Sequence, residues 1–340
     1  MKTSDFYYDL PQELIAQTPL ERRDSSRLMV LHRETGELEH RHFYDIVDYL
    51  QPGDCLVMND SRVLPARLLG HRVPTGGAVE LLLLQDKGGG VWECLAKPGR
   101  KLHPGAELSF GDGALTATVT AEEEGGNRLV QFHYEGIFLE LLERLGKMPL
   151  PPYIREELAD GERYQTVYSR VTGSAAAPTA GLHFSKHLMK RLEIKGVDMA
   201  FLTLHVGLGN FRTVDVEDLT KHKMDSEQVV IPERTAEAVN RVKRAGGKVC
   251  AVGTTVMRSV ESSVSTEGLL KPFDGWTNKF IFSPYEFSVA NCMITNFHLP
   301  YSTQLMMVAA FAGYDALMSA YDVAKKEKYR FGTYADAMLI

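Results

Sequence analysis

Residues 63 to about 131 are patterned differently from the rest of the chain, and this difference most constrains the fold. Short apolar or alternating segments, such as 79–84 and 92–96, are separated by glycine turns at close spacing, among them 88–90 and 125–127. Strand-like segments between closely spaced turns are typical of antiparallel sheets. The region therefore predicts a small antiparallel barrel or sandwich.

The β-rich region is followed by a predicted helix over 137–145 and then by the stretch Met148-Pro149-Leu150-Pro151-Pro152-Tyr153. Because proline has a fixed φ and no amide hydrogen, this stretch can continue neither a helix nor a central strand. We expect it to form a rigid extended connection.

Helical and strand-like patterns alternate in the following part of the chain. Leu188 and Leu192 lie one turn apart in a basic helical segment, and the strand-like segment 199–205 follows. A second helix ends at Gly246-Gly247, and a strand is expected over 248–252. Such alternation predicts a mixed α/β domain, which the N-terminal residues up to about 60 are expected to join.

The last part of the chain predicts a strand over 293–298, stopped by Pro300, and then a helix. Ser302 is a suitable N-cap. We expect one long helix that runs from there to about Lys326.

Together these patterns predict an α+β fold with two domains. Residues 1–62 and 150–340 are expected to form a larger mixed α/β catalytic domain. Residues 63–149 are expected to form a smaller all-β antiparallel barrel inserted into it.

Composition is that of an ordinary globular protein, with 340 residues, 44% hydrophobic and 24% charged. Cys55, Cys94, Cys250 and Cys292 are far apart and lack metal-ligand spacing, so we expect reduced thiols, no metal site and a cytoplasmic protein. No signal segment or membrane-length apolar run is visible, so no membrane association is expected. Without coiled-coil heptads, a monomer is the expected state.

The net charge of 38 − 44 = −6 argues mildly against a nucleic-acid-binding protein, because phosphate contacts supply much of such affinity. A local basic face would nevertheless be sufficient. Basic residues cluster in segments 97–103, 186–195 and 241–248. Taken singly, each cluster is more typical of a solvated surface.

Four short loops at the ends of predicted strands combine glycine, hydroxyl groups, histidine and arginine. In α/β folds, such loops usually carry the ligand site. The candidates are Thr179, Gly181, His183 and Phe184 in the first loop, His205, Gly207, Gly209 and Phe211 in the second, Gly253, Thr254, Thr255 and Arg258 in the third, and Asn296 and His298 in the fourth.

Each loop alone also has an ordinary structural explanation. A lone histidine at a strand end is more often structural than catalytic, and the Gly207-x-Gly209 turn lacks the third glycine of a dinucleotide fingerprint, because Arg212 stands there. No metalloprotease, P-loop or nucleophile-elbow motif is present. Four such loops in one half of the chain favour one composite site, but they do not name its substrate.

The same loops, with further segments, resemble the motifs of the S-adenosylmethionine:tRNA ribosyltransferase-isomerase family of queuosine biosynthesis. Each motif is weak, but the ordered set is highly specific and covers essentially the whole chain. The further segments are 5–6, 10–17, 23–28, 59–67, 148–153, 162–168, 329–331 and 336–340.

The resemblance implies a two-part architecture and a reaction. The family moves the ribosyl portion of S-adenosylmethionine onto 7-aminomethyl-7-deazaguanine at the tRNA wobble position and rearranges it, giving epoxyqueuosine. Adenine and methionine leave. S-adenosylmethionine is thus a consumed co-substrate, tRNA is the partner, and no prosthetic group is implied.

The reaction suggests roles for the candidate residues. The sulfonium makes the ribose 5′ hydrogens acidic, so a base that is neutral near pH 7 would help, with His205 and His183 as leading candidates and His298 third. Arg258 with the 254–255 turn is a candidate partner for the methionine carboxylate.

Aromatic rings could stack on adenine or on the target base. The candidates for this role are Phe184, Phe211 and Phe297. The candidates for contacts with tRNA phosphates are Arg27, Arg62, Arg100 and Lys101.

The chain departs from the family's pattern at two positions. Asp225 stands where the family commonly has the second histidine of His-x-Met-His-x-Glu, and Val256 stands where it commonly has serine. Because of these departures, a family member that has lost its activity stays open as an alternative.

Two other protein classes are open on the sequence. An S-adenosylmethionine-dependent RNA methyltransferase would need a strand-GxGxG signature that is missing, and a non-catalytic RNA-binding protein fits the acidic charge and histidine-bearing loops poorly. Products separate the enzymes, because methyl transfer yields S-adenosylhomocysteine and ribosyl transfer yields adenine and methionine.

Overall fold

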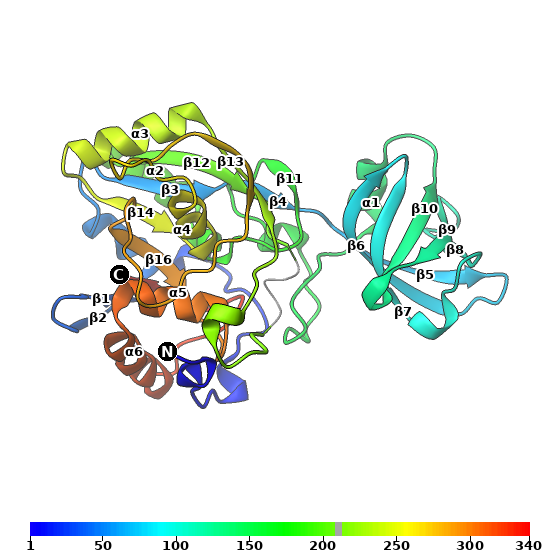
Figure 1. Ribbon diagram of the computed structural model, residues 1–340, viewed down its shortest axis with the longest axis horizontal. Helices are drawn as coiled ribbons and strands as arrows, with labels where there is room; N and C mark the ends of the chain where they lie inside the picture. Colours follow the sequence, from blue (N-terminus) through cyan, green and yellow to red (C-terminus); the bar gives the residue numbers. More distant parts are fainter. Residues whose placement is uncertain (208–212) are drawn as a thin grey trace. The chain divides into compact units, whose positions relative to one another are not determined.

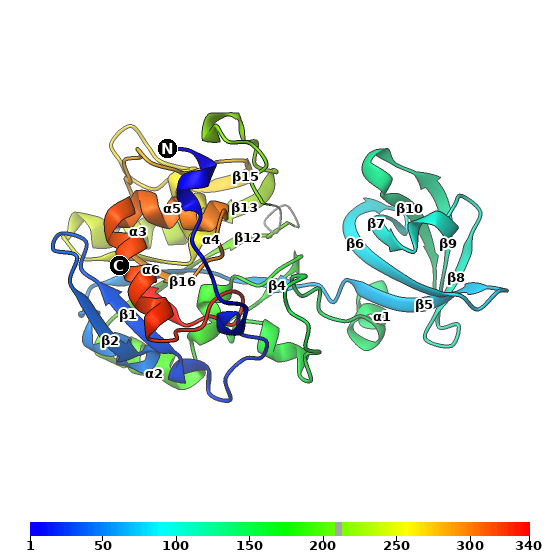
Figure 2. The same cartoon turned by 90° about the horizontal axis from the view of Figure 1, so that it is seen from below.

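The computed structural model describes residues 1–207 and 213–340. The chain divides into two compact units, one made of Met1–Arg62 with Pro151–Ile340 and the other of Val63–Leu150 (Figure 1, Figure 2). The larger unit is a mixed α/β structure, and the smaller one is an antiparallel barrel inserted into its sequence. The expected α+β fold class is confirmed.

One nine-stranded mixed sheet forms the centre of the larger unit, in the order β15-β13-β12-β3-β14-β16-β17-β1-β2. The strands are β1 (Arg27–Leu31), β2 (Leu38–His42), β3 (Cys55–Asn59), β12 (Asp198–Leu204), β13 (Glu227–Ile231), β14 (Val249–Val252), β15 (Phe273–Thr277), β16 (Cys292–Asn296) and β17 (Ala337–Leu339). The adjacent strands β12, β3, β14 and β16 run parallel. Their carboxyl ends therefore lie at the same edge of the sheet.

The central strands are buried on both faces, because successive side chains enter two different apolar cores. In β3, Cys55 and Val57 enter the first core, and Leu56 and Met58 enter the second. The first core is shared with α3 (Glu233–Arg244), α4 (Thr254–Glu261), α5 (Thr303–Ala312) and α6 (Tyr314–Lys326), and the second with α2 (Lys186–Lys195).

The expected single helix after Ser302 is wrong, because the segment forms the two helices α5 and α6. Ser302 does cap α5, and its hydroxyl accepts the amide of Leu305 at 3.2 Å. The break lies at Gly313, whose φ of 93° and ψ of 131° are incompatible with a right-handed helix.

The smaller unit is a closed barrel with the strand order β10-β7-β6-β5-β8-β9. Its strands are β5 (Arg67–Val73), β6 (Ala78–Gly88), β7 (Val91–Lys97), β8 (Glu107–Phe110), β9 (Leu115–Glu122) and β10 (Arg128–His133), followed by helix α1 (Phe138–Leu145). Neighbouring strands pair antiparallel. A separate two-stranded sheet pairs β4 (Ser61–Val63) with β11 (Val171–Ser174).

Candidate active site

The predicted loops meet at the carboxyl edge of the parallel strands. Residues 205–207 follow β12, residues 253–255 follow β14, and residues 297–298 follow β16. The first loop forms a 3-10 turn, Thr179–His183, and joins this edge through a hydrogen bond between His183 Nε2 and Asn296 Oδ1 at 2.8 Å.

Two polar residues at the end of the otherwise apolar strand β3, its last residue Asn59 and the following Asp60, hold this edge together. Asn59 donates to the carbonyl of Leu204 at 3.0 Å, and its Oδ1 accepts the amide of Leu204 at 3.0 Å. Asp60 accepts the Thr203 hydroxyl at 2.5 Å and pairs with Arg170 at 3.2 Å. The sequence reasoning used Asn59 and Asp60 only as part of a family motif. The signal that could have found them is a pair of polar side chains at the end of a fully apolar strand.

His205 differs from the other two candidate histidines in its hydrogen bonding. Its Nδ1 atom is buried and has no hydrogen-bond partner among the described residues. The ring lies against Gly173, where a Cβ would come within 3.0 Å of His205 Cε1. Burial lowers the pKa of His205, and the Asp60 carboxylate opposes this shift. The imidazole is therefore mainly a neutral base at pH 7.

His183 has both ring nitrogens in hydrogen bonds, because Nδ1 contacts the Ser26 hydroxyl at 2.9 Å and Nε2 contacts Asn296. Burial lowers its pKa to about 4. His298 contacts the Thr295 hydroxyl at 2.7 Å through Nε2, and burial lowers its pKa to about 3. Both rings are neutral and held by partners, as expected of structural histidines.

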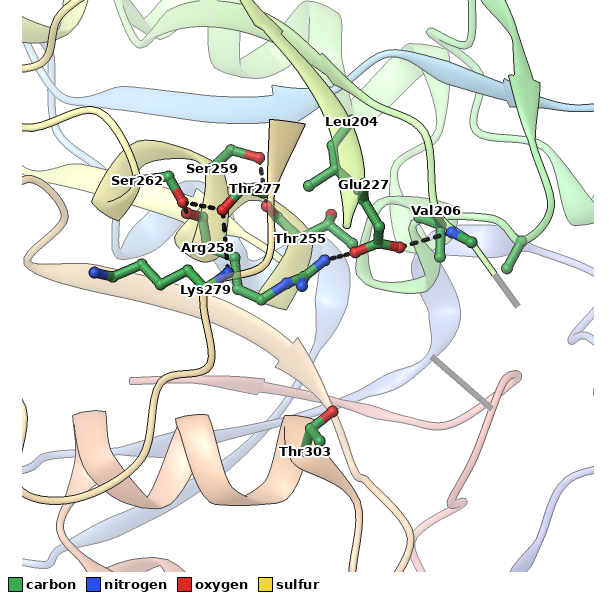
Figure 3. A network of polar contacts seen from close by, with 12 residues as sticks. Leu204, Val206, Glu227, Thr255, Arg258, Ser259, Ser262, Thr277, Lys279 and Thr303 are labelled. Carbon is green, nitrogen blue, oxygen red and sulfur yellow. Dashed lines mark hydrogen bonds and ion pairs between the residues drawn. The ribbon is translucent and has the colours of Figure 1, made fainter. Parts of the chain in front are cut away.

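Arg258 and Glu227 form an ion pair in which both side chains are almost completely buried (Figure 3). The second carboxylate oxygen of Glu227 accepts the amide of Gly207 at 2.6 Å. Burial lowers the pKa of Arg258 to about 10, so the guanidinium remains charged at neutral pH. Its Nη1 atom forms no hydrogen bond within the described part of the chain. The sequence reasoning missed Glu227 as a site residue, although it lies in a quoted motif.

A small hollow lies beside Arg258. Its walls combine hydroxyl and amide groups with apolar side chains. They are formed by Met224, Thr254, Arg258, Phe280, Ile281, Thr303, Gln304 and Met307. Gly253, at the turn between β14 and α4, has a φ of 95°, a conformation that favours glycine. Thr255 is buried, and its hydroxyl oxygen lies 3.4 Å from Asn59 Nδ2.

Other candidates for ligand contacts have structural positions. Phe184 and Phe297 are fully buried in the two apolar cores, so neither ring offers a free face for stacking. Gly181 packs against Tyr168, whose hydroxyl would lie 2.1 Å from an added Cβ. Gly209 and Phe211 lie outside the described residues.

The four candidates for phosphate contacts fall into two groups. Arg27 donates to the carbonyl of Glu327 at 2.6 Å and lies over the Tyr329 ring, and Arg62 pairs with Glu162. Both arginines are therefore already engaged within the protein. Arg100 and Lys101 are exposed in a 3-10 turn of the smaller unit.

The two departures from the family's pattern lie in different environments. Val256 is fully buried in the first apolar core, facing side chains rather than a ligand hollow. Asp225 is exposed, two residues before Glu227. A serine at 256 in this backbone would therefore be a core residue.

Within 1–207 and 213–340, no group of three or more His, Cys, Asp or Glu residues is arranged to hold a metal ion. All four cysteines are buried and unpaired as disulfides. No helix in these ranges has the length and apolar character needed to cross a membrane.

Comparisons with known proteins agree with the resemblance found in the sequence. The family model described as queuosine biosynthesis protein matches residues 3–340. The S-adenosylmethionine:tRNA ribosyltransferase-isomerases of Acetivibrio thermocellus and Symbiobacterium thermophilum are 56% and 55% identical to the chain, each over 340 residues and 100% of both sequences. The crystal structure of the S-adenosylmethionine tRNA ribosyltransferase from Thermotoga maritima has a TM-score of 0.57 and 38% identity, and the match covers 99% of each chain. This chain belongs to the queuosine biosynthesis protein family.

Proposed function

We propose that the chain transfers the ribosyl portion of S-adenosylmethionine to 7-aminomethyl-7-deazaguanine at the tRNA wobble position and isomerises it to give epoxyqueuosine. Adenine and methionine leave, and one proton is released when the amine nitrogen forms its bond to the transferred group. The observation that carries the proposal is the full-length match, at 55–56% identity, to relatives named for this activity.

His205 is the proposed base for the acidic 5′ hydrogen of the sulfonium substrate, and the proton that it removes balances the one that the departing adenine gains. It is neutral, it has an unpartnered ring nitrogen, and it lies at the edge where the parallel strands end. His183 and His298 are less suited. Both ring nitrogens of His183 are held, by Ser26 and Asn296, and Nε2 of His298 is held by Thr295.

Arg258 is proposed to donate a hydrogen bond from Nη1 to S-adenosylmethionine in the adjacent hollow. Because Glu227 already neutralises its charge, Arg258 suits a ribose hydroxyl or a ring nitrogen better than the methionine carboxylate. This replaces the role suggested by the sequence. S-adenosylmethionine is consumed, and no prosthetic group is needed for the proposed reaction.

We propose that the protein is a cytoplasmic monomer and that it binds tRNA without associating with a membrane. The buried reduced cysteines support a reducing compartment. Light scattering of the purified protein, alone and with tRNA, tests the monomer: a mass of twice the 38.0 kDa chain would exclude it.

Mass spectrometry tests the reaction with purified protein, S-adenosylmethionine and tRNA carrying the aminomethyl-deazaguanine base. We expect adenine and methionine to appear in step with a heavier wobble nucleoside. S-adenosylhomocysteine would instead identify a methyltransferase. Binding of tRNA without turnover would identify a member that has lost activity, and Asp225→His and Val256→Ser would then be tested for recovery.

A further inference from the structure

A second hollow in the larger unit is lined by basic and hydroxyl side chains from segments far apart in the sequence. The polar lining comes from Arg23 and Ser26 near the N-terminus, Arg163 in the turn Gly161–Tyr164, Thr179 and His183 in the turn Thr179–His183, and Thr333 and Tyr334 near the C-terminus. None of these residues lines the hollow beside Arg258. Nothing in the proposed mechanism uses Arg23, Arg163 or Tyr334.

The two arginines are held by neutral acceptors. Arg23 donates to the carbonyls of Leu182 at 3.3 Å and Glu162 at 2.8 Å, and Arg163 donates to the carbonyls of Glu21 at 3.3 Å and Leu20. Main-chain carbonyls orient a guanidinium but carry no formal charge. Neither arginine forms an ion pair with a carboxylate in the described part of the chain.

The nearby carboxylates have other partners. Glu162 pairs with Arg62, and the Asp160 side chain accepts the amide of Glu162. Both still act on Arg23 through space, but burial and the neighbouring Arg163 charge outweigh them and lower the pKa of Arg23. The hollow therefore keeps two like charges close together, which an anion would stabilise.

Two polar atoms at the hollow lack partners. The Tyr334 hydroxyl forms no hydrogen bond among the residues described, and only 6% of the residue's surface is exposed to solvent. Arg163 Nε is likewise buried and has no hydrogen-bond partner among these residues. Burial raises the pKa of Tyr334 to about 12, so its hydroxyl remains a donor at neutral pH. Buried donors without acceptors are uncommon in native proteins.

We propose that this hollow is an oxyanion-binding site in which Arg23, Arg163 and the Tyr334 hydroxyl hold an anionic group of a substrate. Guanidinium groups fixed by other contacts are suited to carboxylate and phosphate oxygens. His183, which is neutral and fully hydrogen-bonded, forms part of the wall and supplies no charge.

Two substrates of the proposed reaction carry such a group, and the inference rests on the proposed function for their identity. One is the carboxylate of the methionine portion of S-adenosylmethionine, for which the charge-compensated Arg258 is poorly suited. The other is a backbone phosphate of tRNA. Both groups present oxygen atoms with negative charge, and binding experiments separate them.

The sharpest variant is Tyr334→Phe, because it removes only the unpartnered hydroxyl. A structural hydroxyl would lower Tm when removed, whereas this change should leave Tm unchanged or raise it. We expect about a tenfold weaker Kd for the substrate that supplies the anion, the order of a hydrogen bond to a charged group. Arg163→Gln should weaken the same Kd by about 10- to 100-fold, and Arg163→Lys should recover part of the loss. Arg234→Gln, an exposed arginine on α3, is the control.

Calorimetry shows which substrate supplies the anionic group. Three ligands are compared: S-adenosylmethionine, 5′-methylthioadenosine, which lacks the carboxylate, and tRNA over a salt series. Loss of S-adenosylmethionine affinity with unchanged methylthioadenosine affinity identifies the carboxylate. Weaker tRNA binding with a salt slope reduced by about one identifies a phosphate. Wild-type affinity of folded Tyr334→Phe and Arg163→Gln for both substrates overturns the site, even if the wild type forms product. A wild type that binds through these residues without turnover would refute the proposed function and leave the site standing.

Discussion

His183 is a buried imidazole and His205 a half-buried one, and of the two only His205 has a ring nitrogen without a hydrogen-bond partner among the described residues. We therefore expect His205→Ala to lower kcat by about 10²- to 10⁴-fold, the usual contribution of a general base. Tm should change little, because no hydrogen bond of the side chain is lost. Adenine release under saturating substrate and a thermal melt measure the two effects.

The matched control is His183→Ala. It removes the imidazole partner of Asn296 Oδ1 and of the Ser26 hydroxyl, which keeps only its contact with the Arg23 carbonyl at 3.3 Å, so the free energy of unfolding should fall by about 1–3 kcal/mol. A full catalytic rate in folded His205→Ala, or a loss of the same size in both variants when Tm is equal, would remove His205 as the base.

The pKa of His183 predicts a pH dependence of stability. The folded state holds this ring neutral with a pKa of about 4, against 6.5 for the free side chain. The stabilisation is thus complete above pH 6.5 and is lost as pH falls towards 4. The difference, 6.5 − 4 = 2.5, corresponds to on the order of 3 kcal/mol. Tm measured from pH 7.5 to 4.5 should fall more steeply in the wild type than in His183→Gln, and parallel curves would contradict this.

At the scale of residues, the sequence brought out strand-end polar groups but could not separate ligand contacts from packing. Phe184 and Phe297 lie in loops rich in polar groups, yet both enter apolar cores. Glu227 is the first residue of β13, and its role becomes visible only because the fold brings Arg258, 31 residues later in the sequence, into contact with it. Such partners depend on the tertiary fold, which one sequence does not display.

At the scale of elements, Gly313 separates α5 from α6. Its φ of 93° would strain any side chain, although an added Cβ would meet no atom within 4 Å. We expect Gly313→Ala to lower the free energy of unfolding by about 1–3 kcal/mol, through backbone strain alone. Urea denaturation measures this value. Ser319→Ala, an exposed change within α6, should have little effect, and equal stability of the two variants would exclude the strain.

Helices and strands with regular spacing were predictable from the sequence, including α1, α2, β12 and β14. The break at Gly313 was not, because the apolar pattern of α5 and α6 continues across it and only the backbone angles reveal the change of direction. The 3-10 turns that carry His183 and Arg163 were also not expected, since three to five residues show no periodicity.

At the scale of the whole molecule, the barrel offers Arg100 and Lys101 as exposed cations with no intramolecular partner among the residues described. The double change Arg100→Glu and Lys101→Glu should weaken tRNA binding and reduce the slope of log Kd against log salt by about one to two. Fluorescence anisotropy over a salt series measures it, with Arg144→Glu on α1 as control. An unchanged slope would exclude this turn from the interface.

The two-unit organisation was predictable because glycine turns and prolines mark the change of pattern along the chain. The order of strands in the nine-stranded sheet was not, since β3 lies between β12 and β14, which are more than 130 residues away in sequence. Apolar strands buried on both faces carry no sign of which neighbour they pair with.

The position of β3 also affects how the protein is made. Both strands that flank β3 are translated after the barrel, so β3 initially has no neighbouring strands, and its edges and apolar faces are uncovered. The barrel, whose strands are consecutive in sequence, can already close at that stage. During synthesis the chain thus passes through a stage in which the barrel is folded but the nine-stranded sheet is still incomplete. At that stage, we expect β3 to be the segment that most needs a chaperone's protection from aggregation.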